Sequence, residues 1–205
     1  MKNRKYILII VILITLIISG IIIFFYLKNP DIQKNSKDRN VTHNIEKYGY
    51  TLTDTDTNYY KELYDKLENA LDAEKIDDEL YASLISQIFV TDFYTLSNKI
   101  SSSDIGGLEF FIEKYRDNFA LKAKDTIYKS VRNNLYENRE QELPMVTKAS
   151  IENISKTSYS YGDIVDPNAY SVKLNITYNI DLSYPTTVKL VLVHNEDKIE
   201  VVKVD

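Results

Sequence analysis

Acidic and amide side chains alternate in one short segment of the chain, LTDTDTNYYKELYD. Asp54, Asp56 and Asn58 occupy alternate positions, and Asp65 closes a window of twelve residues. Oxygen ligands at this spacing are typical of the calcium-binding loop between two helices. That loop needs glycine at its sixth position and glutamate at its twelfth, whereas this segment has Tyr59 and Asp65 there.

The residues after this motif follow the spacing of a helix. Tyr60, Leu63 and Leu67 recur every three or four positions, which would place Glu62 on a helix and away from an ion. Polar residues directly before a helix accept hydrogen bonds from its first N–H groups, and acidic charge favours its positive end. We therefore interpret the motif as a helix start, and we predict no metal and no cofactor.

A second segment, SSSDIGGLEFF, has the glycine pair of a phosphate-binding loop. It lacks the lysine and the preceding strand that such a loop requires. The segment predicts a turn at the junction of two helices, with Asp104 capping the second helix. Gly106 or Gly107 would then adopt a backbone conformation that is unfavourable for other residues.

Groups suited to catalysis are scarce. The chain has no cysteine and two histidines, of which His43 lies in a polar segment and His194 ends a predicted strand. The acidic pair Glu109 and Glu113 falls on the polar side of a predicted helix, which is typical of a solvated face. We predict no enzymatic activity, because an enzyme would need His194, or a carboxylate pair assembled by the fold, to face a cleft.

An apolar segment precedes the elements that would position these groups. Residues 6–27 contain no charged side chain and are long enough, at about 1.5 Å per residue, to cross a hydrocarbon core of about 30 Å. The basic leader MKNRK and the missing cleavage site indicate an uncleaved signal anchor. We expect residues 1–28 to form a cytoplasmic tip and a single membrane span, with the lipid bilayer as the partner of residues 6–27, and residues 29–47 to form a polar linker.

Net charge changes along the chain. Residues 1–47 contain eight Lys/Arg and three Asp/Glu, a net charge of +5, and residues 48–205 contain seventeen and twenty-seven, a net charge of −10. The two values sum to the −5 of the whole chain. Because an acidic domain repels phosphate at long range, we predict that it binds no nucleic acid.

Residues 48–205 are predicted to form an extracytoplasmic domain of the α+β class. Apolar residues recur at helical spacing within residues 58–137, and at strand spacing within residues 146–204. We expect three to four helices packed on a four-stranded antiparallel sheet. The helical patterns cover residues 60–71, 77–96, 108–115 and 123–135, and the strands cover residues 146–159, 170–181, 186–194 and 198–204.

The last two strands predict a hairpin with two unlike faces. A turn between Glu196 and Asp197 would place His194 opposite Ile199 and Val191 opposite Val202. One face would pack on the helices, and the other would expose valines between two charged residues. We interpret this outer face as a candidate interaction patch, although strand propensity alone would also explain the valines. The patch consists of Lys189, Val191, Val193, Glu200, Val202 and Val204.

Three segments behind the single span carry a resemblance: YGYTLTDTDTNYYKELY, FVTDFYTLSNK and DIGGLEFF. They resemble an uncharacterised family of membrane-anchored proteins from low-GC Gram-positive bacteria, over residues 48 to about 135, and this implies no known activity. In architecture alone, the chain is similar to the NTF2-like domains of conjugation-channel components, which act as assembly scaffolds. The resemblance implies a membrane-tethered interaction or scaffold domain of a cell-envelope assembly, with a protein partner outside the cytoplasm.

The tyrosines leave a second function open. Fifteen of the seventeen tyrosines follow residue 27, and tyrosine side chains can stack on sugars or anchor ligands. Several fall on predicted buried faces, where core packing explains them. A tyrosine-lined pocket would favour a ligand-binding module for peptidoglycan or a small molecule, whereas a flat exposed apolar patch would favour a protein partner.

Overall fold

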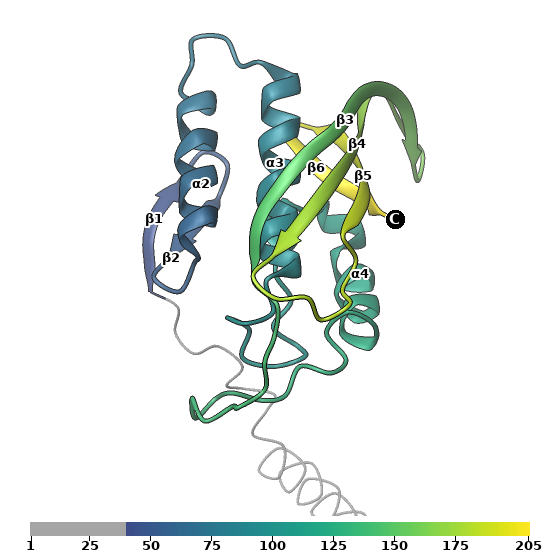
Figure 1. Ribbon diagram of the computed structural model, residues 1–205. Helices are drawn as coiled ribbons and strands as arrows, with labels where there is room; N and C mark the ends of the chain where they lie inside the picture. The colour runs from purple at the N-terminus through teal and green to yellow at the C-terminus, as the bar shows by residue number, and fades with distance from the viewer. Residues whose placement is uncertain (1–39) are drawn as a thin grey trace, which may run out of the picture. The chain divides into compact units, whose positions relative to one another are not determined.

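Figure 1 shows the computed structural model of the chain, which describes residues 40–205. The predicted membrane span at residues 6–27 lies outside this described part. Among residues 40–205, no helix combines the length and the apolar character that crossing a membrane requires. The elements are β1 (Val41–Ile45), β2 (Tyr50–Thr53), α2 (Asn58–Leu71), α3 (Asp78–Tyr94), the 3-10 helix η2 (Leu108–Phe110), α4 (Glu113–Asp125), β3 (Val146–Tyr161), β4 (Ile164–Tyr178), β5 (Thr187–Asn195) and β6 (Lys198–Val204).

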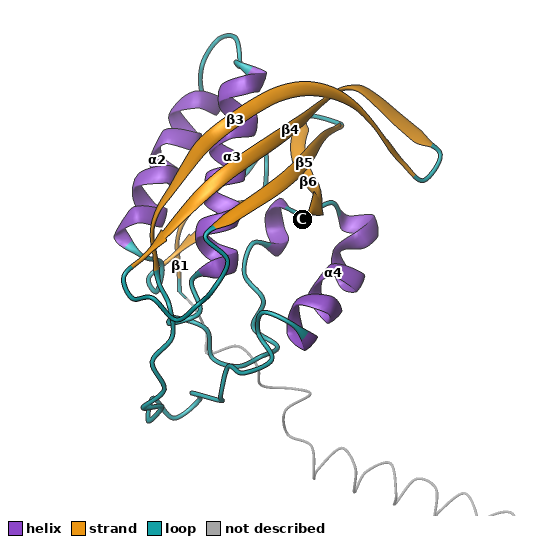
Figure 2. Cartoon of the chain, turned by 45° about the vertical axis from the view of Figure 1, so that its right-hand side comes forward, coloured by secondary structure: helices purple, strands orange, loops and turns teal. Residues whose placement is uncertain are grey.

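The main sheet confirms the predicted α+β fold. Its four antiparallel strands follow the order β3-β4-β5-β6, and three α-helices pack with them. Helix α3 contacts β3, β4 and β6 on one side and α2 on another, as Figure 1 shows. Because α3 is covered on several sides, its buried residues surround the helix and do not form a single stripe. Figure 2 shows that β3 and β4 continue as a long curved hairpin beyond their neighbours.

A second, two-stranded sheet corrects the predicted linker. Residues 29–47 were expected to be a polar linker, but Val41–Ile45 forms β1 and pairs with β2. The hairpin turns at Gly49, which has a φ of +67°. Helix α2 holds the hairpin, because the Tyr64 hydroxyl accepts a hydrogen bond from Ile45 N (3.0 Å) and donates one to Tyr50 O (2.8 Å). Most side chains of β1 are exposed, so its sequence carries no apolar alternation that could have indicated a strand.

The helical region is shorter than its sequence predicts. The third pattern (108–115) forms η2 and only the first residues of α4, and the fourth pattern (123–135) leaves the helix at its start, because α4 ends at Asp125. Residues 126–145 contain turns but neither helix nor strand. Tyr128 explains why the chain leaves the helix. Its fully buried side chain donates a hydrogen bond to Phe93 O (2.6 Å) and accepts one from Gly106 N (3.0 Å). This anchoring contact takes the place of a further helical turn.

The C-terminal hairpin has the predicted turn but a shifted register. His194 lies opposite Ile199 as expected, whereas Val191 lies opposite Lys203. A bulge between Val191 and Leu192 leaves Val202 without a direct partner on β5. This irregularity moves the side chains of β6 relative to the alternation that the sequence suggests.

Burial removes most of the candidate interaction patch from the surface. Val193 is fully buried, Glu200 is 4% exposed, and Val191 and Val202 are each 8% exposed. Lys189 is exposed and Val204 is half-buried. Other parts of the chain reach the hairpin here: the Tyr161 hydroxyl donates to His194 O (3.2 Å), and Ile112 N donates to Val201 O (2.9 Å). The patch is therefore largely core and not an exposed apolar face.

Candidate functional site

A cavity of about 170 Å³ lies where three distant parts of the chain meet, namely β2 with the start of α2, the end of α3, and the segment leading into η2. Three of the lining side chains are carboxylates, and we name this site the carboxylate cavity. Its lining is Thr51, Thr53, Asp56, Tyr60, Asp92, Ile105, Gly107, Leu108 and Glu109.

Asp56 belongs to the turn that begins α2. Its Oδ2 accepts hydrogen bonds from Thr53 N (2.7 Å) and Thr53 Oγ1 (3.0 Å). Thr57 is the N-cap, and its hydroxyl accepts from Tyr60 N (3.2 Å). The motif is therefore a helix start, as predicted, and among residues 40–205 no group of three His, Cys, Asp or Glu side chains could hold a metal ion. Burial raises the pKa of Asp56 above its ordinary value, and the nearby charge of Asp92 acts in the same direction.

Glu109 forms the opposite wall of the cavity. Its Oε2 accepts hydrogen bonds from Thr51 N (3.2 Å) and Thr51 Oγ1 (3.0 Å), and its Oε1 accepts one from the Tyr60 hydroxyl (3.1 Å). Burial raises the pKa of Glu109 to about 7, although the hydrogen bonds from Thr51 and Tyr60 favour the charged form. The predicted solvated position of Glu109 is wrong, because the turn of η2 directs this carboxylate inward.

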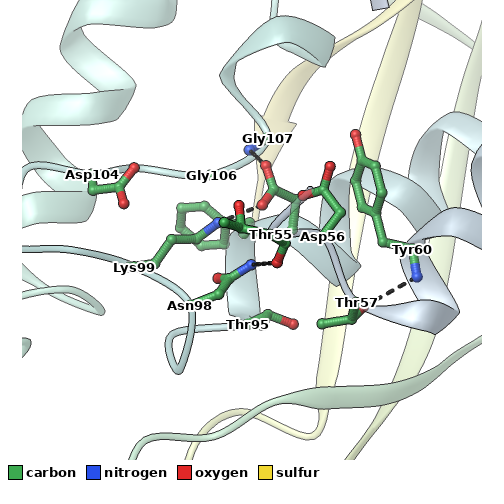
Figure 3. Close-up of polar contacts among 12 residues, drawn as sticks. Thr55, Asp56, Thr57, Tyr60, Thr95, Asn98, Lys99, Asp104, Gly106 and Gly107 are labelled. Atoms are coloured by element: carbon green, nitrogen blue, oxygen red, sulfur yellow. Dashed lines mark hydrogen bonds and ion pairs between the residues drawn. The ribbon is translucent and has the colours of Figure 1, made fainter. Parts of the chain in front are cut away.

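Asp92 links the end of α3 to the glycine pair. Its Oδ1 pairs with the ammonium of Lys99, and its Oδ2 accepts a hydrogen bond from Gly107 N (2.5 Å). Dashed lines mark these two interactions at the labelled Lys99 and Gly107 in Figure 3. The Lys99 side chain is completely buried, whereas that of Asp92 is 17% exposed. The ion pair is therefore buried on the side of Lys99, and its Asp92 side lines the cavity.

The glycine pair has the structural role that its sequence predicts. Gly107 has a φ of +75°, and a Cβ there would lie 2.8 Å from a ring carbon of Phe89. A Cβ at Gly106 would lie 2.4 Å from Asp92 O. Asp104, however, caps neither η2 nor α4, because its Oδ2 accepts from Ile100 N (2.8 Å) within the preceding turn.

Charge in the carboxylate cavity is unbalanced. Lys99 compensates Asp92, while no lysine or arginine belongs to the lining that the structure describes. Asp56 and Glu109 accept hydrogen bonds from hydroxyl and backbone N–H donors, and neither carboxylate forms an ion pair within residues 40–205, although the charge of Lys99 favours ionised Asp56. Such an arrangement can accept a cationic group, and Glu109 can exchange a proton near neutral pH.

His194 is not in the lining of the carboxylate cavity. It lies near two residues that line a larger hollow, with its ring 6.0 Å from that of Tyr170 and its Nε2 3.9 Å from Asp78 Oδ2. Its backbone N–H donates to Asp166 Oδ2 (2.7 Å), and its ring Nδ1 lies 2.9 Å from the same oxygen. Burial would raise the pKa of Asp166, but the hydrogen bonds from His194 and Asn168 N outweigh it and lower the pKa. The hollow has a volume of about 520 Å³ and is lined by Lys75, Ile76, Asp77, Asp78, Glu79, Lys156 and Tyr170.

The other histidine, His43, lies on β1, and its Nε2 is 2.6 Å from Oε1 of Glu68.

The tyrosines serve mainly in the core. The hydroxyls of Tyr50 and Tyr81 pair at 2.7 Å in the interior, and Tyr64 and Tyr128 are fully buried. Each of the two cavities has one tyrosine in its lining, Tyr60 or Tyr170. The convergence of several tyrosine hydroxyls, which would favour a ligand-binding module, is therefore not seen at either site.

Comparison of the chain with protein-family models, with characterised proteins and with solved structures gave no match.

Proposed function

We propose that this chain is a membrane-tethered, non-enzymatic interaction domain of a bacterial cell-envelope assembly. In this proposal the carboxylate cavity receives a cationic side chain of a protein partner. The observation that carries it is the pair Asp56 and Glu109, two half-buried carboxylates that line one cavity without a compensating cation in its described lining. A buried carboxylate gains most from a partner that brings positive charge and hydrogen-bond donors.

The size of the cavity favours a side chain over a larger ligand. Sites for small molecules usually have volumes of about 300–1,000 Å³, and this cavity has about 170 Å³. A single lysine or arginine side chain suits that space. Arginine suits it best, because its planar guanidinium presents several donors to two carboxylates at once. The net charge of −10 over residues 48–205 would also attract a basic partner at long range.

The proposed location outside the cytoplasm depends on the N-terminal segment. The uninterrupted apolar run of residues 6–27 behind a basic leader supports a single-pass anchor with a cytoplasmic N-terminus. Residues 40–205 would then face the cell envelope, where an exported partner can reach the carboxylate cavity. Protease protection in spheroplasts tests the orientation, because external protease would degrade the domain only if it lies outside.

Peptide titration tests the recognition of a cationic group. A short peptide with one central arginine is added to the full-length chain, and the backbone amides of Thr51 and Gly107 are followed by NMR. The matched control peptide carries citrulline, which keeps the shape of arginine but not its charge. We expect shifts with arginine only, stronger above pH 7 because Glu109 is then charged, and loss of those shifts in Asp56→Asn/Glu109→Gln. Equal shifts with citrulline would refute the proposal.

A second candidate function is suggested by the hollow beside His194. Its volume of about 520 Å³ falls within the usual range for small ligands, and its lining carries both lysines and acidic residues. A ligand with charges of both signs, such as a peptidoglycan stem peptide, would fit this lining. Titration with that peptide should then shift the amides of Lys156 and Tyr170, and Lys156→Met should weaken the response. Shifts confined to the carboxylate cavity would dismiss this candidate.

A further inference from the structure

Lys99 and Asp92 form an unusual pair, because the lysine has no exposure at all. Its ammonium contacts Asp92 Oδ1 directly, and its side chain is 0% exposed. Taking a charge out of water is costly, and each partner of this pair offsets that cost for the other, so removing one partner alone would leave an uncompensated buried charge. The amine is confined next to the carboxyl group and shielded from competing water.

We propose that Lys99 and Asp92 condense to form an intramolecular amide bond between Nζ and Cγ. The inference stands on three features of the structure: the direct contact, the complete burial of the amine, and the donors arranged around the carboxyl group. It concerns a covalent modification of the chain itself, and it requires no bound partner.

The reaction needs no oxidant and no second reactant. A proton passes from the ammonium to the carboxylate within the pair, which gives a neutral amine and a carboxylic acid. The Nζ lone pair then attacks Cγ, a C–N bond forms, and Oδ2 becomes an oxyanion. Collapse of this intermediate breaks the bond from Cγ to Oδ1, and Oδ1 leaves as water with the second proton from nitrogen. One ammonium and one carboxylate become one amide and one water.

The surroundings of Asp92 match the needs of that sequence. Gly107 N donates to Oδ2 at 2.5 Å, where it would stabilise the developing oxyanion. The absence of a side chain at Gly106 leaves room for the amine, because a Cβ there would lie 2.7 Å from Lys99 Nζ. Glu109 lines the same cavity and is suited to carry a proton to the departing oxygen, because burial raises its pKa to about 7.

The carboxylate cavity also offers a route for the product. Asp92 belongs to its lining, so the released water would enter a space continuous with the reacting carboxyl group. The amide would then tie the end of α3 to the segment that follows it. In a chain without cysteine, such a cross-link would stabilise this segment by the same loop-closing effect as a disulfide.

Intact mass spectrometry of the denatured full-length chain tests the proposal. We expect a mass lower than that of the sequence by one water molecule. Trypsin should also fail to cleave after Lys99, so that residues 76–114 remain one peptide, whose fragmentation assigns the bond to Asp92 and Lys99. A full sequence mass with normal cleavage after Lys99 would show a simple ion pair and overturn the inference.

Variants separate this reaction from other losses of water. Asp92→Asn should lose one ammonia in place of one water, because the group that leaves the attacked carbon is then an amine. Lys99→Arg should retain its full mass, and circular dichroism would check that it folds. Glu109→Gln should form the amide more slowly, followed as the fraction of lighter chain over time. Lys189→Ala, which lies outside the carboxylate cavity, should form the amide normally. The mass is measured without any added peptide, so failure of the proposed peptide binding would leave this result unaffected. Loss of water from Lys99→Arg would also overturn the inference.

Discussion

The hydroxyl of Tyr60 donates a hydrogen bond of 3.1 Å to Oε1 of Glu109, a residue 49 positions further along the chain. Thr51 donates to the other oxygen of the same carboxylate from β2. Helix α2 and the β1–β2 hairpin thereby fix the position of η2, the 3-10 helix before α4. This carboxylate is exposed enough to meet a ligand in the cavity and buried enough that its pKa is raised to about 7.

The free energy of unfolding should fall as the pH rises through the pKa of Glu109. The folded state raises this pKa from 4.5 to about 7, so it binds the proton more tightly than the unfolded chain does. The resulting stabilisation is complete below pH 4.5 and is lost as the pH rises through about 7. Its upper limit is about 3 kcal/mol, reduced because the side chain keeps some solvent contact.

Glu109→Gln isolates this contribution in urea unfolding measured at several pH values. The variant should show a flatter decline between pH 4.5 and about 7 than the wild type. Some decline should remain, because burial also raises the pKa of Asp56. Identical profiles for the two proteins would mean that Glu109 titrates as it does in the unfolded chain.

Gly107→Ala should destabilise the domain more than Gly49→Ala. Both glycines have positive φ, +75° and +67°, but a Cβ at Gly107 would lie 2.8 Å from Phe89, whereas a Cβ at Gly49 meets nothing within 4 Å. The backbone cost of about 1 kcal/mol is common to both substitutions. The difference between the two unfolding free energies measures the collision with Phe89, and equal losses would show that the ring moves aside.

Thr57→Ala should cost about 1 kcal/mol of stability, because it removes the N-cap of α2. The Thr57 hydroxyl accepts from Tyr60 N at 3.2 Å, so Thr57→Ser, which keeps a hydroxyl, should stay close to the wild type. Thermal unfolding compares the three proteins. Equal losses in both variants would assign the effect to the missing methyl group and not to the cap.

The unfolding temperature should be the same with calcium and with a chelator. Asp56 is engaged by Thr53, and Asn58 begins α2, so neither side chain belongs to a metal-binding loop. Calorimetry in the two buffers checks this expectation. A rise of several degrees with calcium alone would restore the metal-binding interpretation of Asp54, Asp56 and Asn58.

Val193→Ala should lower stability by about 2 kcal/mol, since it removes buried methyl groups and leaves a cavity. Val193 is 0% exposed, whereas Lys189 on the same strand is exposed and offers a matched control. Lys189→Ala should change stability by less than about 0.5 kcal/mol. Urea unfolding measures both. If Val193→Ala left the free energy of unfolding unchanged, this face of β5 would be exposed in solution and not buried.

The sequence by itself determined the classes and most bounds of the regular elements. Spacing of three and four residues marked α2 and α3, and alternation of apolar and polar residues marked the four strands of the main sheet. These patterns are local, because an element that buries one face repeats its apolar residues with its own period. Polar caps also act locally, which is why the start of α2 was recognised within the acidic motif.

Only the tertiary structure decided which of these residues share a site. Val191 and Val193 alternate along β5 with the residues that were expected to pack on the helices, so the pattern placed them on the outer face. Contacts from other parts of the chain nevertheless bury this face. The residues around Glu109 in the sequence do not show whether its carboxylate points to solvent or inward. Its inward position depends on the turn of η2 and on donors from β2 and α2. Burial and the shared cavity are properties of packing between distant segments, so no local period encodes them.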